Sequence, residues 1–203
     1  MVLTRDEIIK EEILTAAQRL FQQFGIRKTT MEDIAKNICK GKSTLYYYYC
    51  SKEEIFDAVV HKEMDEVLGK TRKAVDLAST AEEKLKVYSA TKMDTLRRIS
   101  NLYQMVRLEM LENPTCHHYL HKEYELREIN LITGILQFGI DNGEFDDRLF
   151  QQMDIMPYII MSSLKGFEFD LFSSNKFDGI ENRFDAIVDL LLNGLKNNAC
   201  VTA

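Results

Sequence analysis

The stretch TTMEDIAKNICKGKSTLYYYYCSK, residues 29 to 52, can be read as a phosphate-binding loop or as two short helices around a turn. Its letters GKST, residues 41 to 44, match the end of such a loop. The loop needs a glycine five residues before Gly41 and a buried strand ahead of it. Lys36 stands at that position, and the apolar residues around it recur at helical spacing. The stretch therefore predicts helix, turn and helix, and no nucleotide-binding loop.

Capping signals predict where the first helices begin and end. Thr4, with a glutamate three residues on, forms a capping box for a first helix that ends near Phe24. Thr30 and Asp33 form a second box, which starts the second helix. A third helix is predicted through about Tyr49, followed by a long fourth helix over KEEIFDAVVHKEMDEVLGKTRKAVDL that is capped by the preceding serine.

The rest of the chain shows the same periodicity. Apolar residues recur at intervals of three and four residues, with few prolines and glycines between them. This pattern predicts further helices at about 80 to 112, 116 to 141, 146 to 172 and 179 to 197. We therefore predict an all-α fold without internal repeats.

Charge is divided unevenly along the chain. The 203 residues carry a net charge of −6, yet residues 1 to 52 contain nine Lys and Arg against six Asp and Glu. The remainder contains 17 basic and 26 acidic residues. We predict a small basic domain over residues 1–51 that faces a polyanion, and a larger acidic domain over residues 52–203 with another task.

Several classes of protein are disfavoured by composition. No run of about 18 apolar residues is present, and the N-terminus is charged, which predicts a cytoplasmic protein without a membrane partner. The four cysteines lie apart without a C-x-x-C pair, so we expect reduced thiols. We find no convergent acid, base or nucleophile by spacing, and predict neither an enzyme nor a cofactor.

The tyrosine-rich helix needs a partner. Successive helical residues lie about 100° apart, so Leu45 and Tyr49 share an inward face while Tyr47, Tyr48 and the residues from Lys42 to Thr44 remain outside. Lysine, hydroxyl and phenol groups bind phosphates and base edges, and a helix fits the major groove. This arrangement predicts a helix-turn-helix with its recognition helix at residues 42 to 48.

The segment from Ile13 to Phe56 closely resembles the N-terminal domain of the TetR family of bacterial transcriptional regulators. The matching features are the alanine-rich first helix that ends in Phe24-Gly25, the Thr29-Thr30 cap and three short motifs, which are Asp33-Ile34-Ala35, Thr44-Leu45-Tyr46 and Ser51-Lys52-Glu53. The resemblance implies a three-helix DNA-binding domain, followed by a helical domain for ligand binding and dimerisation.

The resemblance also implies roles for individual residues. Base edges are assigned to Lys42, Ser43, Thr44 and Tyr48, phosphates to Thr29, Tyr46, Tyr47 and Lys52, and Thr30 completes the DNA-binding set. Two positions depart from the family pattern: Cys39 replaces the usual glycine of the turn, and Ser43 replaces a frequent glycine. Because a cysteine with positive φ costs roughly 1 kcal/mol, we expect Gly41 to take the unusual dihedral instead.

The later helices contain the materials of an apolar ligand site. Methionines and hydroxyl-bearing aromatics suit a cavity with a few polar handles, although the same residues suit simple core packing. The candidates are Tyr88, Met93, Leu96, Tyr103, Met105, Met110, Tyr119, Tyr124 and Phe138. His117 and His121, four apart, have a spacing that can hold a metal, but no third ligand is evident and we predict no metal.

The last two helices have broad apolar faces that could be buried within the monomer or against a second copy. In the family such helices form a four-helix bundle with a symmetry mate. The interface candidates are Met156, Ile160, Ser163, Phe167, Ile187, Leu191 and Leu195. We predict a homodimeric repressor of double-stranded operator DNA that responds to a small-molecule effector. The alternatives are a helical adaptor that binds protein through the tyrosine helix and, less favoured, a metal-assisted enzyme.

Overall fold

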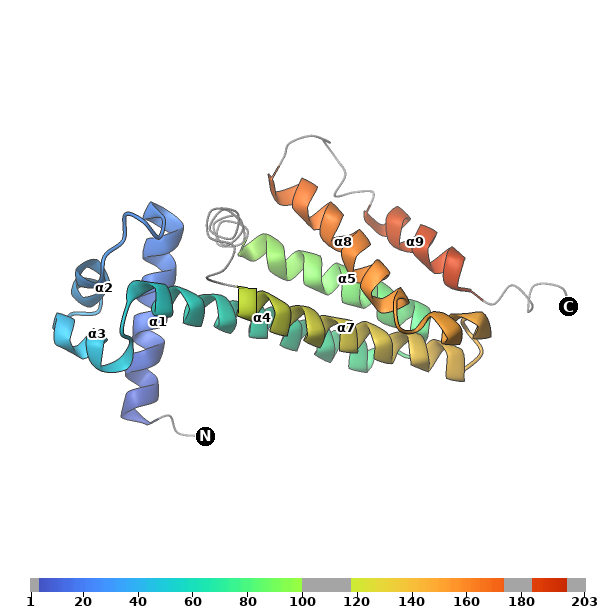
Figure 1. The fold of residues 1–203 in the computed structure, drawn as a ribbon, viewed down its shortest axis with the longest axis horizontal. Helices are drawn as coiled ribbons and strands as arrows, with labels where there is room; N and C mark the ends of the chain where they lie inside the picture. Colours follow the sequence, from blue (N-terminus) through green and yellow to red (C-terminus); the bar gives the residue numbers. More distant parts are fainter. Residues whose placement is uncertain (1–3, 100–117, 174–183, 197–203) are drawn as a thin grey trace, which may run out of the picture. The chain divides into compact units, whose positions relative to one another are not determined.

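The computed structural model describes residues 4–99, 118–173 and 184–196 (Figure 1), and within these ranges the elements are helical. In chain order they are α1 (Arg5–Phe24), α2 (Met31–Asn37), α3 (Lys42–Tyr48), α4 (Lys52–Leu77), α5 (Ala81–Arg98), α7 (His118–Asp141), the 3-10 helix η1 (Asp147–Gln152), α8 (Met156–Ser173) and α9 (Phe184–Leu195). The predicted all-α class is confirmed.

Contacts divide the chain into two units. The first comprises Met1–Asp65 with Ile99–Leu120, and the second comprises Glu66–Arg98 with His121–Ala203. In the first unit α2 contacts both α1 and α3, and Figure 1 shows α2 and α3 on the same side of α1. Among the described helices, none has the length and apolar character that crossing a membrane requires.

The first unit is built around one apolar core. Ile13 and Phe21 from α1, Ile34 from α2 and Leu45 from α3 are fully buried in it. The start of α4 also contributes, since the ring of Phe56 meets that of Phe21 edge to face at 5.5 Å. α4 begins at Lys52, and its first turns belong to this core. The domain boundary between residues 51 and 52 stays a prediction.

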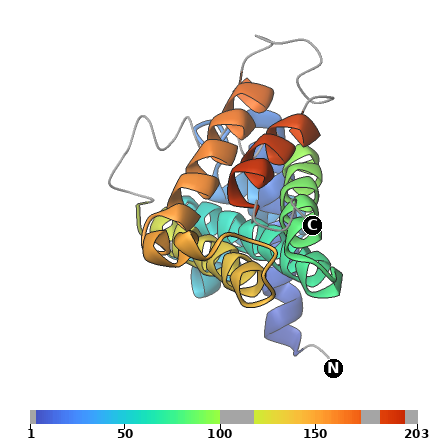
Figure 2. The ribbon, with the colours of Figure 1, turned by 90° about the vertical axis from the view of Figure 1, so that its right-hand side faces the viewer.

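In the second unit α5 contacts both α8 and α9, and α9 lies beside α8 in both views (Figures 1 and 2). The N-terminal end of α5 is closed by the turn after α7. There the Glu144 carboxylate accepts a hydrogen bond of 2.8 Å from the Ala81 N–H, and Phe145 is fully buried. Gly139 gives Phe145 its space, because a Cβ on this glycine would lie 2.2 Å from the ring.

The predicted helix at 146 to 172 is wrong in its first part. The structure instead has the short helix η1 and then α8, which begins at Met156. Proline has no N–H to donate and is tolerated only in the first turn of a helix, so Pro157 requires a helix start immediately before it. Asp146 caps η1 by accepting from the Arg148 N–H at 2.8 Å.

Candidate nucleic-acid interface

The two predicted capping boxes are both present. The Thr4 side chain accepts from the Glu7 N–H, and the Thr30 side chain accepts from the Asp33 N–H at 3.2 Å. In return the Thr30 hydroxyl donates to the Asp33 carboxylate at 2.6 Å. Hydrogen bonds from Thr30 therefore hold the pKa of Asp33 below its usual value. The reciprocal bonds fix the start of α2 and so the direction in which the turn leaves it.

The helix α3 is anchored by one side. Leu45 is fully buried, and Tyr49 packs against the same core at its C-cap. Lys42, Ser43, Tyr46 and Tyr47 lie exposed on the remaining surface. Tyr47 has 77% of its surface accessible, against 49% for Tyr46. The predicted inner position of Leu45 and the predicted outer positions of Lys42, Ser43 and Tyr47 are therefore confirmed. Tyr48, which we also predict to lie outside, instead packs against the core.

The exposed side chains of α3 form a small cationic and aromatic surface. The Lys42 ammonium lies 5.8 Å from the centroid of the Tyr46 ring. The rings of Tyr47 and Tyr48 meet edge to face, with centroids 4.9 Å apart. A positive charge beside phenol hydroxyls offers both a phosphate contact and hydrogen bonds to base edges.

The turn between α2 and α3 contradicts the expectation for Gly41. Cys39 itself takes a positive φ of 53°, whereas Gly41 has φ −74° and is extended. The Cys39 N–H donates to the Lys36 carbonyl at 3.1 Å, and the Lys40 N–H donates to the Ala35 carbonyl at 3.0 Å. This is the Schellman pattern, which requires the left-handed residue directly after the helix cap. The strain therefore falls on the cysteine.

Two residues to which the family resemblance assigns phosphate contacts are bonded to the protein's own backbone. Thr29 is buried, and its hydroxyl donates to the Gly25 carbonyl at 2.8 Å. The Lys52 ammonium donates to the carbonyls of Ile26 at 2.8 Å and of Thr29 at 3.2 Å. It thus fastens the loop between α1 and α2 to the start of α4. The predicted phosphate contacts of both residues stay predictions.

Tyr48 and Thr44 are half-buried, unlike their exposed neighbours on α3. The Tyr48 hydroxyl donates to the Asp6 carboxylate on α1 at 2.8 Å. Sequence reasoning missed this partner because the two residues lie 42 positions apart. Thr30, which we also predict to contact DNA, is exposed at the start of α2.

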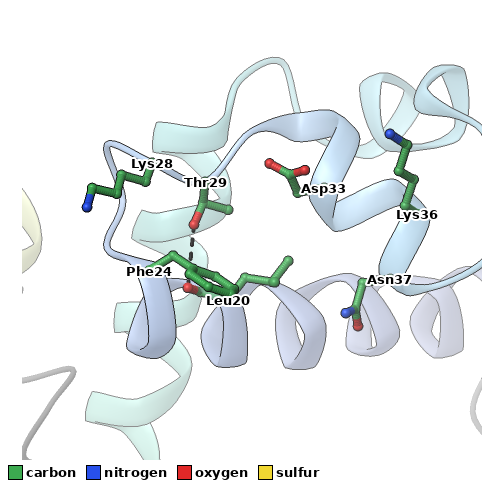
Figure 3. A pocket seen from close by; sticks show the side chains of 7 residues that line it. All are labelled: Leu20, Phe24, Lys28, Thr29, Asp33, Lys36 and Asn37. Atoms are coloured by element: carbon green, nitrogen blue, oxygen red, sulfur yellow. Dashed lines mark hydrogen bonds between the residues drawn. The ribbon is translucent and has the colours of Figure 1, made fainter.

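An open pocket of about 370 Å³ lies between α1 and α2 (Figure 3). Its lining residues are Leu20, Phe24, Lys28, Thr29, Asp33, Lys36 and Asn37. Figure 3 shows the Thr29 hydroxyl directed at the Leu20 carbonyl of α1. Lysines and an aspartate share the lining, and Asp33 is already held by Thr30.

The candidate ligand residues fall into three groups. Tyr88, Met93 and Leu96 are buried on α5 in the second unit. Tyr124 and Phe138 are half-buried on α7, and the Lys84 ammonium lies 4.9 Å from the centroid of the Phe138 ring. The third group lies outside the described residues or side chains and comprises Tyr103, Met105, Met110 and Tyr119. His117 and the side chain of His121 are outside them as well, and no metal-ligand group occurs among the side chains that the structure describes.

None of the candidate dimer residues whose side chains the structure describes is exposed. Ile160 and Leu195 are buried within the chain's own core, which corrects their place in the predicted interface. The half-buried candidates are Met156, Ser163, Phe167 and Leu191, while the side chain of Ile187 is not described. The exposed apolar side chains near them are instead Ile155, Tyr158 and Ile159 around the start of α8, and Leu190 on α9. The remaining candidates stay predictions.

The sequence profile of the family described as "Bacterial regulatory proteins, tetR family" matches residues 13–59, from α1 into α4. The HTH-type transcriptional repressor KstR2 of Rhodococcus jostii (strain RHA1) is 30% identical over 140 residues, 67% of each chain. The chain belongs to the TetR family of bacterial transcriptional regulators. It is a DNA-binding helix-turn-helix protein of a family that is not enzymatic.

Two further comparisons extend the likeness. The uncharacterized HTH-type transcriptional regulator YfiR of Bacillus subtilis (strain 168) is 31% identical over 138 residues, 66% of each chain. The alignments with YfiR and KstR2 thus span about two thirds of those relatives. The crystal structure of the transcriptional regulator FadR from Bacillus subtilis in complex with stearoyl-CoA has the same fold, with a TM-score of 0.75 and 22% identity. That match covers 91% of this chain and 98% of FadR.

Proposed function

We propose that this TetR-family regulator is a homodimeric repressor that binds a near-palindromic operator and leaves it when a small molecule binds. The observation that carries the proposal is the anchoring of α3. Leu45 holds the helix in the core, while Lys42, Tyr46 and Tyr47 stand exposed together. A helix fixed on one side and polar on the other is what entry into a major groove requires.

A second copy of the chain fits the exposed apolar surface of the second unit. Ile155, Tyr158 and Ile159 are each more than two fifths exposed, and Leu190 on α9 is 74% exposed. Apolar side chains gathered on neighbouring helices favour burial against a symmetric partner. A two-fold dimer presents two recognition helices to successive major grooves, about 34 to 36 Å apart.

An apolar or amphipathic effector suits the helices of the second unit. Met93 and Leu96 supply adaptable apolar surface on α5. FadR of Bacillus subtilis, which shares the fold, has been crystallised in complex with stearoyl-CoA. An effector releases DNA only through its differential affinity for two states, and a coupling of 1 to 3 kcal/mol gives roughly 5- to 150-fold release.

DNA recognition is tested by selecting bound duplexes from a random pool and titrating the selected duplex by fluorescence anisotropy. We expect Lys42→Ala and Tyr47→Ala to weaken binding by roughly tenfold or more and to change the preferred sequence. Lys70→Ala removes the same charge as Lys42→Ala from α4 in the second unit, and we expect it to leave the preference unchanged. Equal losses on all duplexes for the α3 variants would contradict base recognition by α3.

Dimerisation is tested by sedimentation at micromolar concentration. Leu190→Glu places a charge on the proposed interface, and we expect a monomer. Leu77→Glu is the matched control, because Leu77 is 86% exposed at the end of α4. We expect it to remain dimeric. A wild-type monomer, or a dimeric Leu190→Glu variant, would rule out this interface.

Release is tested with a compound found by screening for loss of the anisotropy signal. Calorimetry then measures its affinity for the protein with and without operator DNA. Because coupling between two sites is reciprocal, DNA must weaken the compound's binding by the same factor by which the compound weakens DNA binding. Equal affinities in both titrations would show that the site is not coupled to DNA.

A further inference from the structure

A cluster of charged and phenolic side chains lies buried in the second unit, between α5 and α7. Tyr88 and Lys92 are one turn apart on α5, and both donate to the same oxygen, Oε1 of Glu128 on α7. The Tyr88 bond measures 2.5 Å. All three residues are at most 3% exposed. An ion pair and a phenol thus share a site from which water is excluded.

The second carboxylate oxygen of this cluster has no such partner. Oε2 of Glu128 is buried, and no donor in the described part of the chain reaches it. A buried ion pair is tolerated only when the remaining lone pairs are also satisfied. Proteins leave few buried acceptors without a donor, so the atom implies a donor that is not among the described residues.

The neighbouring turns of α7 add a second polar link in an otherwise apolar setting. Glu125, one turn before Glu128, accepts a hydrogen bond of 2.7 Å from Lys165 on α8. Leu131 and Ile132, one turn after Glu128, are buried. Polar groups from α5, α7 and α8 therefore meet at two adjacent turns of α7. A few convergent polar groups among apolar side chains are typical of a small-molecule site.

The geometry points to Oε2 of Glu128 as the acceptor for a neutral hydroxyl of the effector, whose remainder is apolar. This inference rests on the proposed function, in which the second unit binds a small molecule. The Lys92–Glu128 pair is already neutral as a whole. An anionic head would be repelled by the carboxylate at Oε2. A third charge of either sign would also have to be desolvated beside a pair that is already neutral, which leaves an uncharged donor as the matching group.

The test compares octan-2-ol with octan-2-one, which have the same carbon skeleton and differ in whether the oxygen can donate a hydrogen. Binding to the full chain is measured by calorimetry without DNA. A hydrogen bond to a charged acceptor predicts that the alcohol binds roughly tenfold or more tightly than the ketone. Equal affinities, a tighter ketone, or no binding of the alcohol overturns the inference.

A variant locates the preference. Glu128→Gln can keep an oxygen towards Tyr88 and Lys92 while placing an NH₂ where Oε2 stood, so the ketone gains a donor. We expect the preference for the alcohol to fall below about threefold, in keeping with the loss of a charged acceptor. Glu83→Gln, the same change at an exposed position of α5, should retain the full preference. A preference that persists in Glu128→Gln overturns the assignment.

If circular dichroism shows that Glu128→Gln does not fold, the comparison of octan-2-ol with octan-2-one on the wild-type chain tests the inference by itself. The measurement also stands apart from the proposed function, because it contains no operator. Loss of the alcohol preference leaves the DNA-binding, dimer and release experiments unaffected. If the chain fails to bind DNA, the ratio of its affinities for octan-2-ol and octan-2-one can still be measured and still tests the inference.

Discussion

The phenolic hydroxyl of Tyr48 on α3 donates a hydrogen bond of 2.8 Å to the carboxylate of Asp6 in the first turn of α1. This hydrogen bond raises the pKa of Tyr48 above its ordinary value. The contact ties the proposed recognition helix to α1, and it places a negative charge beside the side chains that we propose to approach DNA. Asp6 therefore opposes phosphate binding while it orients Tyr48.

Replacing Asp6 by Asn should strengthen binding to every duplex. The amide can still accept from Tyr48, but the repulsion of phosphates is lost. Single exposed charges contribute roughly 0.2 to 1 kcal/mol, so we expect a gain of about 1.5- to 5-fold that shrinks at high salt. Anisotropy titrations at two salt concentrations measure it. Asp76→Asn, on an exposed position of α4, is the control and should have no effect.

Replacing Cys39 by Gly should stabilise the protein. Cys39 has φ +53°, a left-handed conformation that costs a residue with a Cβ about 1 kcal/mol. Chemical denaturation should show a gain of that order. At the neighbouring Gly41, φ is −74° and an added Cβ would meet only the Ser43 hydroxyl, at 3.6 Å. Because Gly41 is the N-cap of α3, where alanine is less favourable than glycine, Gly41→Ala should destabilise by about 1 kcal/mol or less. The opposite ranking of the two variants would refute the described turn.

Replacing Lys52 by Met should loosen the loop between α1 and α2. The apolar stem is kept, while the hydrogen bonds to the carbonyls of Ile26 and Thr29 are lost. Hydrogen bonds from a charged donor suggest a loss of about 1 to 2 kcal/mol in the free energy of unfolding, discounted for partial exposure. We also expect weaker binding to all duplexes without a change in the preferred sequence. An altered preference would instead place Lys52 at a base edge.

Replacing Gly139 by Ala should destabilise the second unit. The new Cβ would lie 2.2 Å from Cδ2 of Phe145 and 2.8 Å from Cβ of Ala81, and these buried groups have little room to move. Overpacking of this kind costs about 1 to 3 kcal/mol. Gly134→Ala, on the same helix with no atom within 4 Å of the added Cβ, should stabilise by up to about 1 kcal/mol. Thermal unfolding of the two variants should therefore shift in opposite directions.

The first unit could be predicted from sequence because its signals are local. Thr30 and Asp33 are three residues apart, as are Ser51 and Glu54, whose N–H donates to the serine hydroxyl at 3.2 Å. Leu45 is marked as inward by helical periodicity alone. Pro157 is a local signal too, because a proline fits only the first turn of a helix, and the helix predicted through it from residue 146 was wrong for that reason. The TetR family was recognisable from this N-terminal segment.

The partners of the buried polar groups could not be predicted in the same way. Lys92 meets Glu128 across 36 positions, and Tyr48 meets Asp6 across 42. The side of α8 that turns inward, with Ile160 buried and Ile159 exposed, likewise follows from packing against other helices. Caps and periodicity depend on residues that lie within one or two helical turns of one another in the sequence. Contacts between helices depend on how the helices pack, so these pairings and the free apolar surface came only from the folded chain.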